Sequence, residues 1–260
     1  MKNLSQYLQR IGFQTKGSLS VDTLNQLHRA HVSQIPFENL DIHYHQWISL
    51  DTDKFYAKIV DRKRGGFCYE LNGLFLEALK NLGFEAYFIA CSVYVQPLQK
   101  FGPYFAHVAI VVEHKNEQWL VDVGFGSSFP EPLKIEFDKS QKQDGVIYSM
   151  RKINDTEISL DRSFDDGDTF IPMYKFTLHP RTLSDFQEMC EFHQTSDQSP
   201  LFQKKLCSIA TANGRITLTP NHLIITENEK RTEVEVKDEE DFQQKLDTYF
   251  GFQMSAQKQD

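Results

Sequence analysis

RGGFCYELNGLF, residues 64–75, joins two glycines and a cysteine to the start of an apolar helical pattern. The apolar side chains recur at three- and four-residue steps along one helix face: Leu71, Leu74, Phe75, Ala78, Leu79 and Leu82. Gly83 then supplies a residue type that commonly ends a helix. The pattern predicts a helix that begins at or near Cys68 and ends at Gly83.

A cysteine in the first turn of a helix points to chemistry as much as to packing. Amide dipoles and unpaired N–H groups at a helix N-terminus stabilise a thiolate. Free cysteine is also among the most buried residue types, so Cys68 alone is a weak signal. A nucleophile needs a base, and the base needs a group that orients it.

Two strand-like segments, FAHVAIVVE (105–113) and WLVDVG (119–124), carry candidates for these two groups. A hairpin with the loop 114–117 would pair Glu113 with Gln118 and place His107 opposite Gly124. Asp122 is then the diagonal neighbour of His107 on the same face, where Cβ atoms lie about 7–8 Å apart, within reach of an imidazole and a carboxylate together. A loop of odd length without a bulge would put the two side chains on opposite faces.

Together these residues predict a Cys68, His107 and Asp122 triad like that of papain-like thiol enzymes, in which the imidazole holds the thiolate and the carboxylate holds the imidazole. The alternative is that His107 and Asp122 have structural roles. A lone histidine in an apolar strand is more often a core residue, and Asp122 can accept a hydrogen bond from a nearby backbone amide. The triad alone also leaves a thiol hydrolase or protease open. A binding protein that keeps the fold without catalysis is the third alternative.

Composition narrows the class of protein. The chain has 260 residues, 40% of them hydrophobic, and a net charge of −8, which argues against general nucleic-acid binding. No apolar run approaches membrane-spanning length, and the first residues lack the apolar core of a secretory signal. The four cysteines are far apart, which predicts reduced thiols in the cytoplasm: Cys68, Cys91, Cys190 and Cys207.

The order of patterns along the chain predicts an α+β fold. Helical spacing dominates the first third, where Asp22 is the expected cap of a second helix. Strand-like runs follow at 87–95, 105–113 and 119–124, with shorter ones at 146–150, 152–160 and 173–178. We expect a helix over 183–193, a three-stranded meander over 214–237 and a final helix over 238–250. Four residues are expected to share one apolar face of the last helix: Phe242, Leu246, Tyr249 and Phe250.

At this point the sequence resembles the arylamine N-acetyltransferases. The resemblance lies in RGGFCYELN around Cys68, FAHV around His107, VDVGFG around Asp122, SQIPFENLD (33–41) and YKFTLHPRTLSDF (174–186), and it spans nearly the whole chain. It implies a papain-like core with an N-terminal helical bundle carrying the nucleophile (1–84), a β-barrel-like middle domain carrying His and Asp (85–182), and a linking helix with a C-terminal α/β lid (183–260). The short link before residue 183 resembles the bacterial form of the family.

The resemblance also implies the reaction. Cys68 would be the acetylated nucleophile, His107 its partner and Asp122 the orienting carboxylate in a ping-pong N-acetylation of arylamines and arylhydrazines by acetyl-CoA, as part of xenobiotic metabolism. No metal, membrane or nucleic acid is implied. An aromatic amine suits attack on the acetyl-cysteine because it is largely uncharged at pH 7, whereas an amine of pKa about 10 is mostly protonated.

The loop 124–128 is implied to line the mouth of the site. Phe125 would face the acceptor, and Gly126, Ser127 and Phe37 are weaker candidates for substrate or CoA contacts. The alternative for this loop is an ordinary turn after a strand. Three basic residues are candidates for holding CoA, and the sequence does not rank them: Lys100, Arg151 and Lys175. The sequence does not reveal the oligomeric state.

Several other residues have a structural and a functional interpretation. Arg64 and Glu70 flank the nucleophile and would either brace its turn by ion pairing or be surface charges. Gly73 inside the helix costs about 1 kcal/mol against Ala, which predicts close packing against a neighbour. Four histidines raise the possibility of a metal site: His28, His31, His43 and His45. The sequence shows no suitable pattern for a third ligand, so no metal site is predicted.

Overall fold

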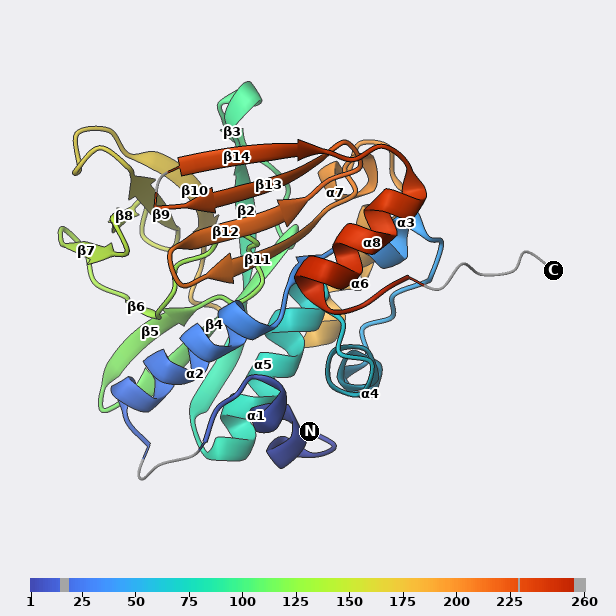
Figure 1. Ribbon diagram of the computed structural model, residues 1–260. Helices are drawn as coiled ribbons and strands as arrows, with labels where there is room; N and C mark the ends of the chain where they lie inside the picture. Colours follow the sequence, from blue (N-terminus) through green and yellow to red (C-terminus); the bar gives the residue numbers. More distant parts are fainter. Residues whose placement is uncertain (15–18, 229, 255–260) are drawn as a thin grey trace.

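The structure is a computed structural model that describes residues 1–14, 19–228 and 230–254 (Figure 1). Helices and strands are segregated along the chain, so the α+β class is confirmed. Three apolar cores hold it together: one around the N-terminal helices, one inside the large sheet, and one under the last helix. The first core also contains Phe88, Val108 and Phe186, so the domain boundaries at 84 and 182 stay a prediction.

The N-terminal third packs helices around one central helix. Its elements are α1 (Leu4–Arg10), α2 (Val21–Gln34), β1 (Phe37–Glu38), α3 (Leu40–His43), α4 (Thr52–Tyr56), a π-helical turn (Ala57–Asp61) and α5 (Cys68–Leu82). The cap of α2 is Ser20, whose hydroxyl accepts the N–H of Thr23 at 3.1 Å. The expectation of Asp22 as the cap was wrong, because Ser20 keeps the extended backbone of a cap while Asp22 already lies in the first turn.

Helix α5 begins at Cys68 and ends before Gly83, as the periodicity predicts. The Glu70 carboxylate accepts the N–H of Phe67 at 3.1 Å, which satisfies one of the free donors of the first turn. Gly83 closes the helix with a left-handed backbone, φ 99°. A Cβ at Gly73 would lie 2.8 Å from the ring of Phe55 in α4, so the predicted close packing is confirmed.

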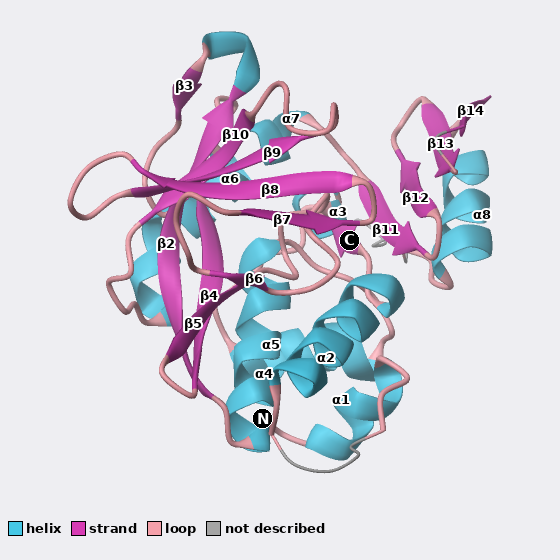
Figure 2. Cartoon of the chain, turned by 90° about the vertical axis from the view of Figure 1, so that its left-hand side faces the viewer, coloured by secondary structure: helices cyan, strands magenta, loops and turns pink. Residues whose placement is uncertain are grey.

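The middle of the chain forms a nine-stranded antiparallel sheet that curls around the second core (Figure 2). Its order is β6-β5-β4-β2-β10-β9-β8-β7, with β3 paired to β2 outside this path. The strands are β2 (Glu85–Val95), β3 (Lys100–Phe101), β4 (His107–His114), β5 (Glu117–Val121), β6 (Leu133–Lys134), β7 (Ser140–Gln143), β8 (Val146–Lys152), β9 (Ile158–Ser163) and β10 (Ile171–Phe176). The expected strand at 152–160 was wrong in its first half, because the Asn154 side chain accepts the N–H groups of Thr156 and Glu157 and makes a turn.

The hairpin of β4 and β5 has the predicted register. Glu113 pairs with Gln118, and one further pair, His114 with Glu117, leaves a two-residue turn. Lys115 and Asn116 both have positive φ, 51° and 65°, which is the backbone that a type I′ turn requires. The loop is shorter than expected but still even in length, so the face of each strand residue is preserved.

The C-terminal part is a second antiparallel sheet backed by one helix. Its strands are β11 (Cys207–Thr211), β12 (Gly214–Leu218), β13 (His222–Glu227) and β14 (Lys230–Glu235), and β1 from the N-terminal third pairs with β11. The expected three-stranded meander is confirmed as β12, β13 and β14, and the sheet is extended by β11 and β1, which were not expected. Helix α8 (Glu239–Phe250) buries Phe242, Leu246 and Phe250 but leaves Tyr249 38% exposed.

A connecting segment joins the two sheets. The helix expected at 183–193 is a 3-10 turn (Leu183–Phe186) followed by α6 (Gln187–Thr195), and a short α7 (Pro200–Gln203) leads into β11. In Figure 2 the second sheet and α8 stand to one side of the barrel-like sheet, and the N-terminal helices lie below both. None of the helices in the described part of the chain combines the length and apolar character that a membrane-crossing segment needs.

Candidate active site

Cys68 is the first helical residue of α5 and is only 3% exposed. Burial raises the pKa of its thiol well above the ordinary value, and the nearby Asp122 carboxylate raises it further. Hydrogen bonds from the backbone of Val108 and Tyr69 act in the opposite direction but are the smaller effect. A thiolate at this site therefore needs a cation beside it, beyond the contribution of the helix N-terminus.

His107 begins β4 and reaches Asp122, which follows β5. Its Nε2 lies 2.8 Å from Oδ2 of Asp122, and both side chains are buried. Burial alone would raise the pKa of Asp122, but the charge of His107 and hydrogen bonds from His107, Asn72 and Gly124 hold that pKa below its ordinary value. An ionised carboxylate only accepts hydrogen bonds, so Nε2 carries the proton and Nδ1 of the neutral ring is free to act as a base.

Asn72 joins the helix to both strands, and the sequence reasoning missed it. Its Nδ2 donates to the carbonyl of Val108 at 2.7 Å and to Oδ1 of Asp122 at 3.0 Å. Its Oδ1 accepts the N–H of Val123 at 3.0 Å. Asn72 lies four residues after Cys68 on the same helix face, and this spacing was the available signal.

Gly124 is required by the approach of the loop to α5. Its N–H donates to Oδ1 of Asp122 at 2.9 Å. A Cβ at this position would lie 2.8 Å from Cα of Cys68 and 2.7 Å from Nδ2 of Asn72. Only glycine lets the chain that follows Asp122 pass this close to the cysteine.

Two of the four histidines considered for metal binding, His28 and His31, have structural contacts. The ring of His28 lies 2.9 Å from the Pro130 carbonyl and 3.1 Å from the Asp122 carbonyl, and burial lowers its pKa to about 4. His31 bonds the hydroxyl of Tyr7 at 2.7 Å. Within residues 1–14, 19–228 and 230–254, no three His, Cys, Asp or Glu side chains converge as metal ligands would. His28 thus supports the backbone of Asp122, a role that the sequence pattern did not indicate.

A cavity of about 670 Å³ opens onto Cys68 and His107. Its walls are mostly apolar and come from β1, β2, the segment 96–103, the loop 124–128 and the segment around α6 and α7: Phe37, Val93, Val95, Leu98, Pro103, Phe125, Phe192 and Leu201. Phe125 packs edge-on against the ring of His107, with centroids 5.2 Å apart. A mostly apolar cavity of this size with a few polar groups is typical of a site for a small organic ligand.

The structure separates the weaker candidates for substrate contacts. Phe37 and Phe125 line the cavity at Cys68, whereas Gly126, together with Phe37, lines a second cavity of about 430 Å³. The Ser127 hydroxyl lies 3.4 Å from Nη1 of Arg162.

The three basic candidates for CoA binding differ in their surroundings. Lys100 lines the cavity at Cys68. Arg151 and Lys175 instead form ion pairs, with Asp161 and Glu157 respectively.

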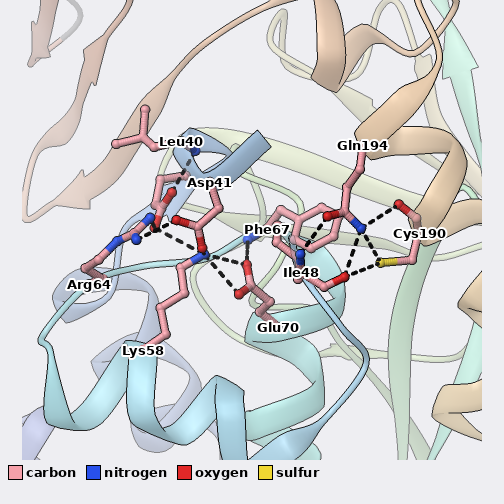
Figure 3. A network of polar contacts seen from close by, with 10 residues as sticks. Leu40, Asp41, Ile48, Lys58, Arg64, Phe67, Glu70, Cys190 and Gln194 are labelled. Carbon is pink, nitrogen blue, oxygen red and sulfur yellow. Dashed lines mark hydrogen bonds and ion pairs between the residues drawn. The ribbon is translucent and has the colours of Figure 1, made fainter. Parts of the chain in front are cut away.

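The two glycines before Cys68 allow the chain to pass a buried charge cluster (Figure 3). A Cβ at Gly65 would lie 2.0 Å from the carbonyl oxygen of Pro36, and one at Gly66 would lie 2.8 Å from the Glu70 side chain. Both positions therefore exclude any larger residue.

Five charged side chains make up this cluster: Glu38, Asp41, Lys58, Arg64 and Glu70. Arg64 pairs with Glu38 at 2.7 Å and with Asp41 at 2.5 Å, and Lys58 pairs with Asp41 and Glu70, each at 2.9 Å. Arg64 and Glu70 are 6% and 2% exposed, so the surface alternative was wrong. They brace the turn through Asp41 and Lys58 and not through each other.

Comparisons with known proteins agree with this geometry. Residues 20–259 match a family model described as N-acetyltransferase. Arylamine N-acetyltransferase 2 of Mus musculus is 31% identical over 271 residues, which cover 96% of this chain and 93% of the mouse protein.

Two solved structures are similar over nearly the whole chain. An arylamine N-acetyltransferase from Bacillus cereus, described as having a unique Cys-His-Glu catalytic triad, is 25% identical with a TM-score of 0.88, covering 96% of this chain and 98% of that one. The Mycobacterium marinum arylamine N-acetyltransferase in complex with CoA is 26% identical with a TM-score of 0.87, covering 96% of this chain and 93% of that one. In this chain the carboxylate beside His107 belongs to an aspartate, Asp122.

Proposed function

Because the chain belongs to the arylamine N-acetyltransferase family, we propose that it carries an acetyl group from acetyl-CoA to arylamines and arylhydrazines through an acetyl-cysteine on Cys68. The observation that carries the proposal is the 2.8 Å contact between His107 Nε2 and Asp122 Oδ2, beside a cavity that Cys68 and His107 share. The cytoplasm is the proposed compartment, since all four cysteines are free thiols. Xenobiotic amines are the proposed acceptors.

The first half-reaction loads the enzyme. Nδ1 of His107 takes the proton of the Cys68 thiol, and the ionised Asp122 stabilises the imidazolium that results. The Cys68 sulfur then bonds to the carbonyl carbon of the thioester, and the carbonyl π bond breaks so that its electron pair moves onto the carbonyl oxygen. When this oxyanion collapses, the bond to the CoA sulfur breaks, and the imidazolium supplies the proton that releases CoA as a thiol.

The second half-reaction delivers the acetyl group. The apolar walls of the cavity favour a neutral aromatic amine, whose nitrogen bonds to the carbonyl carbon of acetyl-Cys68. Nδ1 of His107 takes a proton from that nitrogen, and the carbon–sulfur bond to Cys68 breaks. The products are the N-acetylated amine and the thiolate–imidazolium pair that starts the next cycle.

The test is the intact mass of the protein after brief incubation with acetyl-CoA and no acceptor. We expect the gain of one acetyl group in the unchanged protein and in Cys207→Ser, a matched control in the second sheet, and no gain in Cys68→Ser. Addition of an aromatic amine should then remove the group. CoA release in water at the same rate without amine would indicate a thiol hydrolase, and the absence of both adduct and CoA release would overturn the proposal.

A further inference from the structure

His193 of α6 lines the cavity at Cys68, and the mechanism above does not use it. Its side chain is buried, and both ring nitrogens contact other segments of the chain. Nε2 lies 3.0 Å from the carbonyl oxygen of Ala106, and Nδ1 lies 2.9 Å from the Ser199 hydroxyl. His193 therefore joins the residue just before His107 to the segment that leads into α7.

These hydrogen bonds define one protonation state of the ring. Burial lowers the pKa of His193, the hydrogen bond to the Ala106 carbonyl opposes this effect, and the charge of His107 lowers the pKa further, so the ring is neutral at pH 7. A carbonyl only accepts, so Nε2 carries the ring proton and Nδ1 accepts the proton of the Ser199 hydroxyl. The Ser199 oxygen in turn accepts the N–H of Leu201 at 3.2 Å as the cap of α7. The ring is thus held in a single orientation.

The backbone that His193 holds is strained. Phe105 has φ 65°, a left-handed conformation that bulky side chains rarely adopt. Such a conformation persists only where the surrounding structure enforces it. The Tyr69 hydroxyl donates to the Phe105 carbonyl at 2.6 Å, and His193 donates to the carbonyl that follows, that of Ala106. Because Tyr69 comes directly after Cys68, these two contacts fix where β4 begins relative to the nucleophile.

We propose that His193 is a positioning residue, which holds the start of β4 so that the imidazole of His107 stays beside the Cys68 thiol. The inference rests on the proposed role of His107 as the base for Cys68. His193 itself acts through the backbone, because Ala106 and Ser199 engage both of its nitrogens. Loss of the Nε2 contact would let the strained backbone relax and carry His107 away from the thiol.

The experiment compares His193→Leu with His193→Gln and Gln194→Leu. Leucine supplies neither a donor nor an acceptor, whereas the glutamine amide supplies one of each. Gln194 is the next residue of α6, and its side chain accepts the N–H of Ile48 at 2.7 Å and donates to the Ile48 carbonyl at 2.9 Å (Figure 3). Gln194→Leu therefore removes buried hydrogen bonds from the same helix, at a contact with the N-terminal third instead of with β4.

Three quantities are measured: the rate of Cys68 alkylation by iodoacetamide as a function of pH, kcat/KM for acetyl transfer, and the midpoint of urea unfolding. Cys68→Ser gives the background from the other thiols. We expect His193→Leu to slow alkylation at neutral pH and to lower kcat/KM, each roughly 10- to 100-fold, because misplacement by about 1 Å costs on the order of 10²-fold. Its alkylation profile should also shift to higher pH, since the thiolate loses its cation.

The two comparison variants separate positioning from stability. His193→Gln should keep an alkylation profile close to that of the unchanged protein. Gln194→Leu should lower the unfolding midpoint and leave the alkylation profile unchanged.

The inference is overturned if His193→Leu and Gln194→Leu have the same alkylation profile, or if His193→Gln is impaired as strongly as His193→Leu. If His193→Leu does not fold, Ser199→Ala decides, because it keeps the ring but removes the proton that orients Nδ1; an unchanged profile would then count against the inference. Alkylation involves no acetyl transfer, so it reports on His193 even if acetyl-CoA fails to acetylate Cys68 in the unchanged protein. That failure would count against the proposed function alone.

Discussion

At the scale of single residues, Asp122 organises the candidate active site. Its carboxylate accepts hydrogen bonds from His107, Asn72 and Gly124. Its carbonyl bonds His28 of α2 and accepts the Ser128 hydroxyl. Asp122, which orients the imidazole, is thus held by hydrogen bonds from several segments of the chain. A buried polar network whose members are all bonded in this way is restricted to one geometry.

Asn72→Ala should lower kcat/KM for acetyl transfer roughly 10- to 100-fold, because misplacement of catalytic groups by about 1 Å costs on the order of 10²-fold. The substitution removes one hydrogen bond from Asp122 and leaves the Val123 N–H without its acceptor. The pH dependence of Cys68 alkylation by iodoacetamide should shift as well, a readout that a general loss of stability does not move.

Asn81→Ala is the matched control for this prediction. Asn81 lies on the same helix, and its side chain donates to the Glu77 carbonyl at the surface. Equal kcat/KM values and equal alkylation profiles for the two variants would show that Asn72 has no positioning role.

At the scale of elements, α5 is the centre on which the site is built. It is buried along most of its length, with α4 on one side and strands β2 and β4 on another. The π-helical turn after α4 carries Lys58, which is 2% exposed and bonds the Glu70 carboxylate in the first turn of α5. The start of the helix, and with it Cys68, is therefore held by a neighbouring element as well as by its own cap.

Gly73→Ala should destabilise the protein although alanine is favoured over glycine in helices by about 1 kcal/mol. The new Cβ would lie 2.8 Å from Phe55, and overpacking of a core costs typically about 1–3 kcal/mol. The free energy of unfolding in urea is the measurement.

Phe55→Leu provides the control for Gly73→Ala, since it removes the ring that the methyl group meets. In a double-mutant cycle the alanine should stabilise the Phe55→Leu background. If it destabilises both backgrounds equally, contact with Phe55 is not the cause.

At the scale of the whole molecule, the buried cluster of Glu38, Asp41, Lys58, Arg64 and Glu70 ties β1, α3, the π-helical turn and α5 together (Figure 3). β1 also pairs with β11, so the cluster lies where the N-terminal helices meet the second sheet. Three carboxylates share two cations, which leaves one negative charge in excess. Burial of that excess charge, and then repulsion by Asp41 and Glu38, raises the pKa of Glu70 to about 7 despite the favourable charge of Lys58.

The free energy of unfolding should therefore fall as the pH rises from about 4.5 to about 7 on account of Glu70. The folded-state pKa lies above the ordinary value, so the folded protein binds more protons than the unfolded chain in this window. The contribution is complete below the window and lost above it. Urea unfolding across these pH values measures the effect.

Glu70→Gln should remove this part of the pH dependence, because glutamine does not titrate. Glu113→Gln on β4, an exposed position, is the control and should leave the slope as it is in the unchanged protein. A slope that Glu70→Gln does not alter would show that another group takes up the proton.

The elements that carry the chemistry are predictable from local sequence patterns. The apolar period placed Cys68 at the start of α5, and the alternation of β4 and β5 with an even loop placed His107 and Asp122 on one face. These features follow from short-range geometry, because helix and strand periods are local properties of the chain. The same reasoning failed where local signals compete, as at the Ser20 cap and the Asn154 turn.

The contacts between polar groups from different elements depend on the packing of the whole chain. Asn72, His28 and Lys58 read as ordinary helix residues, yet each bonds a partner from another element in the core. Burial strengthens these contacts, because a hydrogen bond or ion pair that is removed from water has a larger effect on pKa values and on side-chain geometry than the same contact at the surface. Burial in turn depends on how segments distant in the sequence pack together.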